Sequence, residues 1–572
     1  MNSRTQTANA NGRLKLFGLF LVVLGAVFVV RLFYLQIIKG SEYRSAADAS
    51  QVKSLEIPAK RGDIYAYSGS ERVPLVLNER RWLVFADSQF IDDINGLVNR
   101  LSEYGIDLSD SQKAQLEDGS RYVVLVKDFN DQQKSQLQAA EFTGIYFQER
   151  SVRAYAEDSL AAQVLGFVNA DGQGQYGIEE LLANELTGTP GKLKAITDSR
   201  GIPLAFEESN IDIAPVDGQD VTLTIDVGVQ KLVEHAVADE VDRTNARGGT
   251  GIVMDADTGA ILAMSNYPSF SPAAYNQVED ISLFTNNTIS SAIEPGSVMK
   301  VLVAATVLDK GLVGTEYEYY DPDQVVLDGS VIRNAIDYGA QTRKIEDILI
   351  SSLNTGSVHL LQVMGGGEVN QQARTTYYDY LVNHFGLSKL TGVELQNEAS
   401  GQIFGPNEGY GLNIRYGNMT FGQGLTVTPI QLATAYSSIF NGGTRMKPYI
   451  VSAIGQTQTT PVVAQSSVLS PSAIEQLREL MRRMGVHKYG DVQYAGLEIS
   501  GKTGTGQIAN PDGGYYDDQY TGTFAGYIKS SDKTYVIVVT IDRPDVRFAG
   551  TDAAAPVWKD VVKGMINTGK VD

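Results

Sequence analysis

Three short motifs in the C-terminal half carry residue types that together support acyl transfer through a serine. They are Ser297-Val-Met-Lys300, Ser352-Leu-Asn354 and Lys502-Thr-Gly504. A serine hydroxyl is a poor nucleophile and needs a neighbouring base. A lysine can serve as that base when burial and a second cation depress its pKa. The motifs therefore predict Ser297 as the nucleophile of an acyl-transfer site.

The remaining polar residues of the motifs have natural places in such a site. Lys300 follows the serine by three residues and falls on the same face of a helix, so it would act as the base. Lys502 would be the second cation, and Ser352 would relay protons between the two lysines. Asn354 would hydrogen-bond an amide of the substrate.

The elements around the motifs must position them. The run from Ser297 to Gly311 is strongly apolar and predicts a buried helix, with the serine in its first turn, where backbone N–H groups point outward. The S-x-x-K pattern alone is weak, because Ser50-Gln-Val-Lys53 and Ser530-Ser-Asp-Lys533 also fit it in polar surroundings. The signal comes from the ordered trio, with the K-T-G motif beside late apolar strands.

A competing interpretation uses the same glycine-rich stretch. Gly496 to Thr503 matches the phosphate-binding pattern G-x-x-x-x-G-K-[ST], and Tyr535 to Asp542 resembles the strand ending in Asp that such sites use for magnesium. That loop requires a strand before it and a helix opening at the lysine. Four glycines and a proline from Gly504 to Gly514 argue against the helix, so the nucleotide-binding interpretation is disfavoured.

Composition excludes other classes of chemistry. The chain has 572 residues, with 47 Lys and Arg against 67 Asp and Glu, which gives a net charge of −20. Such a charge repels nucleic-acid phosphates, so we expect no nucleic-acid partner. There is no Cys, and the four His are too dispersed for a local metal-ligand motif, so we expect no metal and no cofactor.

The N-terminus predicts a membrane anchor. Residues 16–30 are uncharged and apolar, and extension to Ile38 past Arg31 gives a helix of about 34 Å, enough to cross a hydrocarbon core of about 30 Å. Basic residues and no acids precede the segment, which favours a cytoplasmic tail over residues 1–15 and a single transmembrane pass over 16–38. A cleaved signal peptide ending near Ala47-Asp-Ala49 is the alternative.

The remainder divides near a Pro-, Gly- and Asp-rich joint at residues 214–220. Residues 39–214 alternate short strands, such as Trp82–Phe85, with polar helices, such as 131–140, which predicts a mixed α+β domain. Residues 215–572 begin with a strand at 221–226 and an amphipathic helix at 226–242. A hairpin over 251–264, a long helical middle, two late strands and a final helix near 553–566 predict an α/β sandwich with an antiparallel sheet.

The motifs in this order resemble the class B penicillin-binding proteins over nearly the whole chain. The anchor followed by Arg61-Gly-Asp63 and Gly177-Ile-Glu-Glu180 is similar to the family's pedestal, also called its dimerisation domain. Glu294-Pro-Gly-Ser297 and Phe421-Gly-Gln-Gly424 are similar to landmarks of its transpeptidase domain. The resemblance implies an α+β multidomain chain with a β-lactamase-like sandwich over residues 215–572.

The resemblance implies a peptidoglycan D,D-transpeptidase that β-lactams acylate. In the family's mechanism, Ser297 attacks the penultimate D-Ala carbonyl of a stem pentapeptide, with Lys300, Ser352 and Lys502 as the other catalytic residues. Substrate-binding residues would be Asn354, Thr503, Gly504 and Thr505, and the oxyanion hole would be the backbone N–H groups of Ser297 and Thr505. A D,D-carboxypeptidase side activity would be possible chemistry for the same acyl-enzyme.

The cellular role has several open interpretations. Gly392-Val-Glu394 and the segments 513–524 and 553–557 resemble the septal, FtsI-type group used in cell division, with an elongation-type transpeptidase as the alternative. A noncatalytic β-lactam sensor or division scaffold, and a serine β-lactamase, are further alternatives. The class A β-lactamase motif E-x-x-L-N is only approximated, by Glu394-Leu-Gln-Asn397.

The same resemblance implies partners and location. We expect stem pentapeptides and β-lactams as ligands, and a separate membrane glycan polymerase with other divisome proteins as partners. The lipid bilayer would be contacted through residues 16–38, with the N-terminus cytoplasmic and the catalytic domain outside the plasma membrane.

Overall fold

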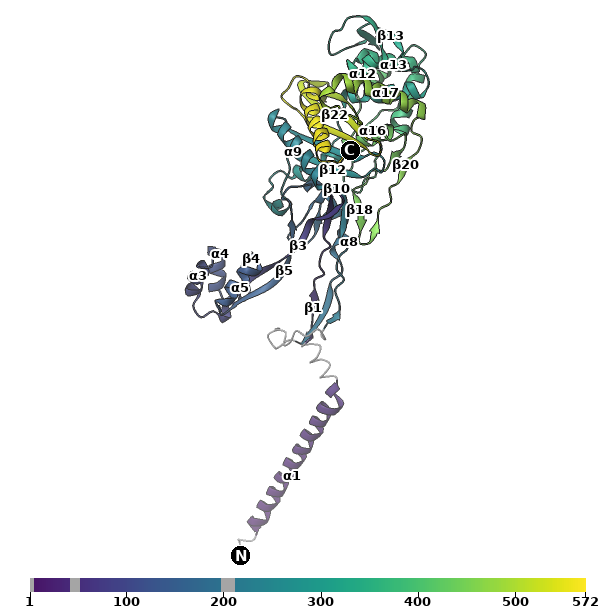
Figure 1. Cartoon of the computed structure of the whole chain (residues 1–572). Coiled ribbons are helices and arrows are strands. Elements are labelled where there is room, and N and C mark those ends of the chain that lie inside the picture. The colour runs from purple at the N-terminus through teal and green to yellow at the C-terminus, as the bar shows by residue number, and fades with distance from the viewer. Residues whose placement is uncertain (1–4, 42–51, 197–210, 572) are drawn as a thin grey trace. The chain divides into compact units, whose positions relative to one another are not determined.

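A computed structural model describes residues 5–41, 52–196 and 211–571 of the chain. The chain forms two compact units. The first comprises Met1–Lys60 and Thr187–Gly218, and the second comprises Arg61–Leu186 and Gln219–Asp572. Figure 1 shows the elements of both units along the chain.

The first unit holds the N-terminal helix and a small sheet. Helix α1 (Thr5–Phe33) continues into the π-helical turn η1 (Tyr34–Ile38), and residues Leu14–Ile38 are long and apolar enough to cross a membrane. This segment contains the predicted anchor, and its large apolar side chains are exposed, as a lipid-facing helix requires. Strands β1 (Val52–Ile57), β8 (Gly191–Ile196) and β9 (Ile211–Ile213) pair in that order.

The second unit contains a seven-stranded sheet that joins strands from its N-terminal part with strands from later in the chain. The order is β19–β18–β10–β2–β3–β4, and β5 also pairs with β3. The bounds are β2 (Ile64–Ser68), β3 (Glu71–Ala86), β4 (Val123–Phe129), β5 (Ile145–Tyr155), β10 (Val221–Asp226), β18 (Val451–Ile454) and β19 (Thr457–Gln458). The long strand β3 pairs with β2 near its start and with β4 near its end.

Three helices cover one end of this sheet: α3 (Ile94–Ser102), α4 (Asp110–Glu117) and α5 (Asp131–Ala139). Capping boxes begin the last two, because Ser109 and Asn130 each exchange hydrogen bonds with a glutamine three residues on. The predicted mixed α+β character of this region is confirmed.

The sheet that carries the candidate site is antiparallel, with strand order β12–β11–β23–β22–β21. Its strands are β11 (Gly248–Asp255), β12 (Ile261–Tyr267), β21 (Glu498–Ala509), β22 (Tyr515–Lys529) and β23 (Thr534–Asp542). Early and late segments of the chain therefore share one sheet, as the sequence predicted, and β21 lies at its edge.

Helices cover both faces of this sheet because its strands β22 and β23 place buried apolar side chains on both sides. Phe524 and Ile528 of β22 face α9 (Val227–Arg243) and α18 (Ala555–Asn567), in one cluster with Trp558. The alternate residues Ala525 and Tyr527 face the opposite cluster, which includes α16 (Pro429–Phe440). The predicted α/β sandwich is confirmed.

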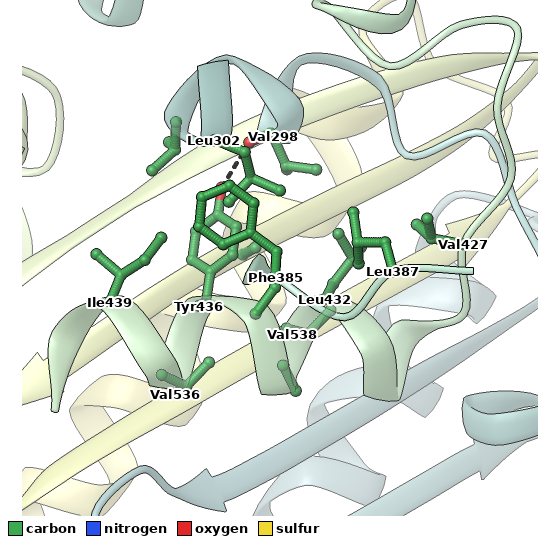
Figure 2. Close-up of a cluster of buried hydrophobic side chains, with 14 of the residues drawn as sticks. Val298, Leu302, Phe385, Leu387, Val427, Leu432, Tyr436, Ile439, Val536 and Val538 are labelled. Atoms are coloured by element: carbon green, nitrogen blue, oxygen red, sulfur yellow. Dashed lines mark hydrogen bonds between the residues drawn. The ribbon is translucent and has the colours of Figure 1, made fainter. Parts of the chain in front are cut away.

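The central helix α11 (Met299–Asp309) lies inside the second cluster and follows the short 3₁₀ turn η6 (Gly296–Val298). The helix is apolar apart from Lys300, Thr306 and its last residue, Asp309, and residues 299–308 are all buried. Figure 2 shows the packing around its start, where the buried Tyr436 hydroxyl of α16 donates to the Val298 carbonyl at 2.7 Å. The core therefore fixes the backbone next to Ser297.

The middle of the chain differs from the prediction of a long helical region. Helices α12 (Ile345–Ile350), α13 (Asn354–Met364), α14 (Gln371–Asp379), α15 (Leu412–Met419) and α17 (Pro471–Lys488) are present. Between α11 and α12 lie two nested strand pairs, β13 (Glu318–Asp321) with β16 (Gln341–Lys344), and β14 (Gln324–Leu327) with β15 (Ser330–Arg333). Each strand has four residues, too few for a clear alternating pattern.

Candidate active site

Ser297 lies in the turn η6, directly before α11, and this turn packs against strand β21. A Cβ atom on Gly296, whose φ is +67°, would lie 2.6 Å from the Thr505 nitrogen. A Cβ atom on Gly504 would lie 2.2 Å from the Pro295 carbonyl oxygen. Glycine is therefore required on both sides of this contact, and the close approach brings the Ser297 turn beside the strand that carries Lys502.

Lys300 lies one turn after Ser297 and is completely buried. Its Nζ is 3.0 Å from Ser297 Oγ, 2.6 Å from the Ser352 carbonyl oxygen and 2.8 Å from Asn354 Oδ1. Burial lowers the pKa of Lys300 well below its usual value, and the charge of Lys502 lowers it further. The neutral amine that a base requires is thus favoured.

Ser352 and Asn354 come from the junction between α12 and α13. Ser352 has a φ of +55°, a left-handed conformation that is sparsely populated by residues other than glycine. Its hydroxyl lies 3.2 Å from Lys300 Nζ and 3.0 Å from Lys502 Nζ. The strained turn therefore directs both the carbonyl and the hydroxyl of one serine toward the lysines.

Lys502 lies on β21 and is 2% exposed. Its Nζ also donates to the carbonyl oxygen of Thr503 at 3.1 Å. Burial, followed by the charge of Lys488, lowers the pKa of Lys502 to about 7. Both lysines of the site are therefore buried amines whose charged forms are disfavoured.

The last part of the site is formed by β21 after Lys502. Thr503 and Thr505 line the same cleft as Ser297. Gly504 lies between them, and a Cβ at Gly550 would lie 2.2 Å from its carbonyl oxygen, so the backbone is enclosed on this side too. The Gly550 amide donates to Thr505 Oγ1 at 3.1 Å. These contacts hold the strand in place while leaving the threonines at the cleft surface.

These residues open into a cleft of about 640 Å³. Among the described residues that line it, none is Asp or Glu, whereas Lys488, Lys502, Arg547 and Lys559 all contribute to its wall. A cationic cleft on a chain of net charge −20 attracts ligands that carry a carboxylate. The absence of a carboxylate from that wall removes the usual base for activating a hydrolytic water.

The structure brings together every motif residue named from the sequence, and it adds residues that the sequence analysis missed. Lys488, Arg547 and Phe548 line the cleft, as do Ile336 and Tyr338 from the segment between β15 and β16. None of them belongs to a local motif, and they reach the cleft only through tertiary packing. No sequence signal identifies them.

The competing motifs have structural explanations. Residues 498–509 form one continuous strand, so the lysine of the G-x-x-x-x-G-K-[ST] match does not open a helix. Ser530 Oγ accepts a hydrogen bond from the Lys533 amide in a turn, and Ser50 lies outside the described residues. Glu394 accepts a hydrogen bond from the Ile450 amide, which is a structural contact. Within the described residues, no group of three or more His, Asp or Glu side chains is arranged to hold a metal ion.

Comparison with known proteins agrees with this arrangement. The model of the penicillin-binding protein transpeptidase domain matches residues 249–563, and the model of the penicillin-binding protein dimerisation domain matches residues 56–223. Penicillin-binding protein PbpB of Mycolicibacterium smegmatis is 30% identical over 588 residues, covering 95% of this chain and 88% of the relative. Peptidoglycan D,D-transpeptidase FtsI of Escherichia coli K12 is 28% identical over 568 residues, covering 96% and 91%.

A solved structure has the same fold. Penicillin-binding protein 3 of Mycobacterium tuberculosis, crystallised with aztreonam, superimposes with a TM-score of 0.68 at 25% identity, covering 90% of this chain and 98% of that one.

Proposed function

Because this chain belongs to the penicillin-binding protein transpeptidase family, we propose that it cross-links peptidoglycan as a serine D,D-transpeptidase and that Ser297 carries the acyl group. The observation that carries this assignment is the environment of Lys300 Nζ. Two of its close neighbours, the Ser352 carbonyl and Asn354 Oδ1, accept hydrogen bonds and cannot donate them. A neutral amine that donates its two hydrogens to them has its lone pair left for the Ser297 proton.

Acyl transfer follows from this protonation state. The Ser297 oxygen bonds to the penultimate D-Ala carbonyl carbon while its proton moves to Lys300. Backbone N–H groups of Ser297 and Thr505 stabilise the oxyanion. The proton reaches the leaving nitrogen through Ser352, with Lys502 supplying positive charge, and terminal D-Ala departs. An amine of a second stem then attacks the acyl carbon and releases Ser297.

Substrate placement uses the remaining motif residues. Asn354 Nδ2 donates one hydrogen to the Arg333 carbonyl at 3.0 Å, and its second hydrogen serves the substrate amide. Thr503 and Thr505 bind the carboxylate of the donor, with Gly504 allowing the close approach of the backbone. A β-lactam presents the same carboxylate and carbonyl and acylates Ser297.

The wider biological assignment rests on the relatives and on the anchor. The chain acts in septal wall synthesis, as its likeness to FtsI suggests, beside a membrane glycan polymerase and other divisome proteins. Residues 1–15 are cytoplasmic, 16–38 cross the membrane once, 39–214 form the pedestal and 215–572 form the transpeptidase domain outside the cell. Depletion in the native host gives undivided filaments on this proposal, whereas loss of rod shape would indicate an elongation enzyme.

The chemical assignment is tested by intact-protein mass spectrometry of the full chain in detergent after incubation with benzylpenicillin. One adduct per chain, mapped to the Ser297 peptide and absent from Ser297→Ala, supports it. Ser530→Ala is the matched control, since it alters a second S-x-x-K match and should label normally. Labelling that persists in Ser297→Ala rejects the nucleophile. Release of D-Ala from a stem pentapeptide in the presence of an amine acceptor separates a transpeptidase from a sensor.

A further inference from the structure

The end of strand β15 and the residue after it, Arg333 and Asn334, hydrogen-bond to the first two residues of helix α13, Asn354 and Thr355. The Asn354 amide has one donor and one acceptor as partners. Its Oδ1 accepts a hydrogen bond from Lys300 Nζ at 2.8 Å, and its Nδ2 donates one to the Arg333 carbonyl at 3.0 Å. These partners fix the orientation of the amide uniquely. The backbone of Arg333, at the end of β15, therefore sets the position of the oxygen that receives Lys300.

The next residue, Asn334, holds the start of helix α13. Its Oδ1 accepts from the Thr355 amide at 3.1 Å and from the Thr355 hydroxyl at 3.0 Å. The residue preceding the helix, Leu353, has no side chain able to cap it. Asn334 supplies the missing cap from a segment 21 residues earlier. Helix α13 starts at Asn354, so this remote cap acts at the catalytic end of the helix.

Asn334 is itself held on its other side. Its Nδ2 donates to Asp323 Oδ1 at 2.8 Å, and the Asp323 amide donates to Asp321 Oδ1 at 2.9 Å. Asp321 is fully buried and lies 3.4 Å from the Arg343 guanidinium. A hydrogen-bonded chain thus runs from the nested strand pairs to the first turn of α13.

The strand pair β14–β15 is held in place by packing on one face and by hydrogen bonds at its turn. Leu327 and Ile332 face the main core and are buried, whereas Val326 and Val331 on the other face are exposed. In the turn between the strands, Asp328 Oδ2 accepts from the Asn413 amide at 2.8 Å and so holds the start of α15. The pair is docked at the N-termini of two helices that belong to the catalytic domain.

We propose that Asn334 is a positioning residue for acyl transfer, which holds Ser352 and Asn354 against Lys300 by capping α13 from a distant segment. The proposal rests on the proposed function of Ser297 and Lys300. Without this cap, the first turn of α13 is free to shift, and a displacement of about 1 Å at a catalytic group can cost about 100-fold in rate. Asn334 does not need to touch the substrate for this effect.

The test compares Asn334→Ala with Asn370→Ala in the full chain. Asn370 caps α14 in the same way, through Oδ1 to the Ala373 amide, and its Nδ2 donates to the Gly365 carbonyl. Both variants lose one helix cap and one side-chain donor. The limiting acylation rate constant at saturating benzylpenicillin is measured separately from the final adduct stoichiometry.

We expect Asn334→Ala to lower the limiting rate constant by about 10- to 100-fold, with one adduct per chain still formed in the end. Asn370→Ala should retain the parental rate constant. Equal rate constants in Asn334→Ala and the parent would overturn the proposal, and so would equal losses in the two variants. A reduced stoichiometry with a parental rate constant indicates partial unfolding and also contradicts it.

A second pair of variants distinguishes a loss of positioning from a loss of folding. Asn334→Asp keeps the acceptor for Thr355 but places its carboxylate against that of Asp323, where Asn334 Nδ2 donated a hydrogen bond. The variant should therefore acylate slowly. Adding Asp323→Asn restores one donor and one acceptor in that pair and should recover most of the rate. Failure of this rescue counts against the proposal. Loss of the Ser297 assignment itself would appear differently, as labelling of Ser297→Ala or as an unlabelled parent chain.

Discussion

The Ser352 hydroxyl lies 3.0 Å from Lys502 Nζ and connects this lysine to Lys300, whose Nζ is 3.2 Å from the same oxygen. A hydroxyl has one hydrogen, so it can donate to one amine while it accepts from the other. The two lysines are therefore coupled through a group that conducts a proton in either direction. Their protonation states are properties of the pair.

A bell-shaped pH dependence of the limiting acylation rate constant follows. Lys300 must be neutral to take the Ser297 proton, so the rate rises as pH increases through its lowered pKa. Lys502 must be charged to assist proton return, so the rate falls as pH exceeds about 7, the pKa to which burial and Lys488 bring it. Stopped-flow acylation with a chromogenic cephalosporin from pH 5 to 10 measures both limbs.

Lys488→Met tests the origin of the alkaline limb. Its charge is one of the causes that lower the pKa of Lys502, so removing it should move the alkaline limb to higher pH. The acid limb, which depends on Lys300, should move less. An alkaline limb that stays at the same pH in Lys488→Met would show that this limb does not report the titration of Lys502.

Lys502→Met should stabilise the folded chain while abolishing rapid acylation. The folded-state pKa of about 7 lies below the ordinary 10.5, so unfolding takes up a proton between these values and the lysine destabilises the fold at neutral pH. Removing the buried amine should gain about 1–3 kcal/mol at pH 7, and the gain should vanish above pH 10.5. Thermal unfolding at pH 7 and at pH 10.5 checks the sign, and a variant less stable than the parent at pH 7 would contradict it.

Gly504→Ala should slow acylation by disturbing the contact between β21 and the Ser297 turn. The added Cβ would meet the Pro295 carbonyl oxygen at 2.2 Å, and backbone on both sides must move apart. A loss of about 10-fold or more in the acylation rate is expected. Gly490→Ala is the matched control, because its Cβ would meet no atom within 4 Å. Comparable loss in both variants would point to a general effect of the substitution.

Tyr436→Phe should loosen the start of α11 without emptying the core. The ring remains, but the Val298 carbonyl, which accepts the Tyr436 hydroxyl at 2.7 Å in a fully buried position, loses its partner (Figure 2). An unmade buried hydrogen bond costs about 1–3 kcal/mol, and the adjacent Ser297 should acylate more slowly. Tyr377→Phe serves for comparison, because the equally buried Tyr377 hydroxyl makes only a 3.4 Å contact with Met419 and should lose less stability.

Sequence patterns predicted those parts of the fold that have long, regular periodicity. The amphipathic helix at 226–242 appears as α9, and the apolar segments after Thr523 and Tyr535 appear in β22 and β23. The strand pair β14–β15 was missed, because Leu327 and Ile332 alternate with exposed residues over only four positions per strand. In such short strands, tertiary docking decides the structure.

The residues of the candidate site likewise fall into those that a local pattern predicted and those that it did not. Motif residues such as Ser297 and Lys502 were predicted because their chemistry requires particular residue types at particular spacings. Lys488 and Asn334 were not predicted, because each acts on the site across a long sequence separation and neither spacing is fixed by a local element. Lys502 lies near Lys300, as the sequence predicted, whereas the cause of the lowered pKa of Lys502 required the structure.

A long-lived acyl-enzyme is the expectation from the wall of the cleft. Deacylation by water needs a base beside the ester, and none of the described lining residues is Asp or Glu, while Glu394 is engaged with the Ile450 amide. Lys300 is the remaining base, and its lone pair lies against the oxygen of Ser297 that is already acylated. Benzylpenicillin should therefore give an adduct that persists through a chase far longer than the time needed to form it, as followed by intact-protein mass. Rapid loss of the adduct, with catalytic release of penicilloate, would instead assign the chain to hydrolysis and require a base that reaches the ester from outside this wall.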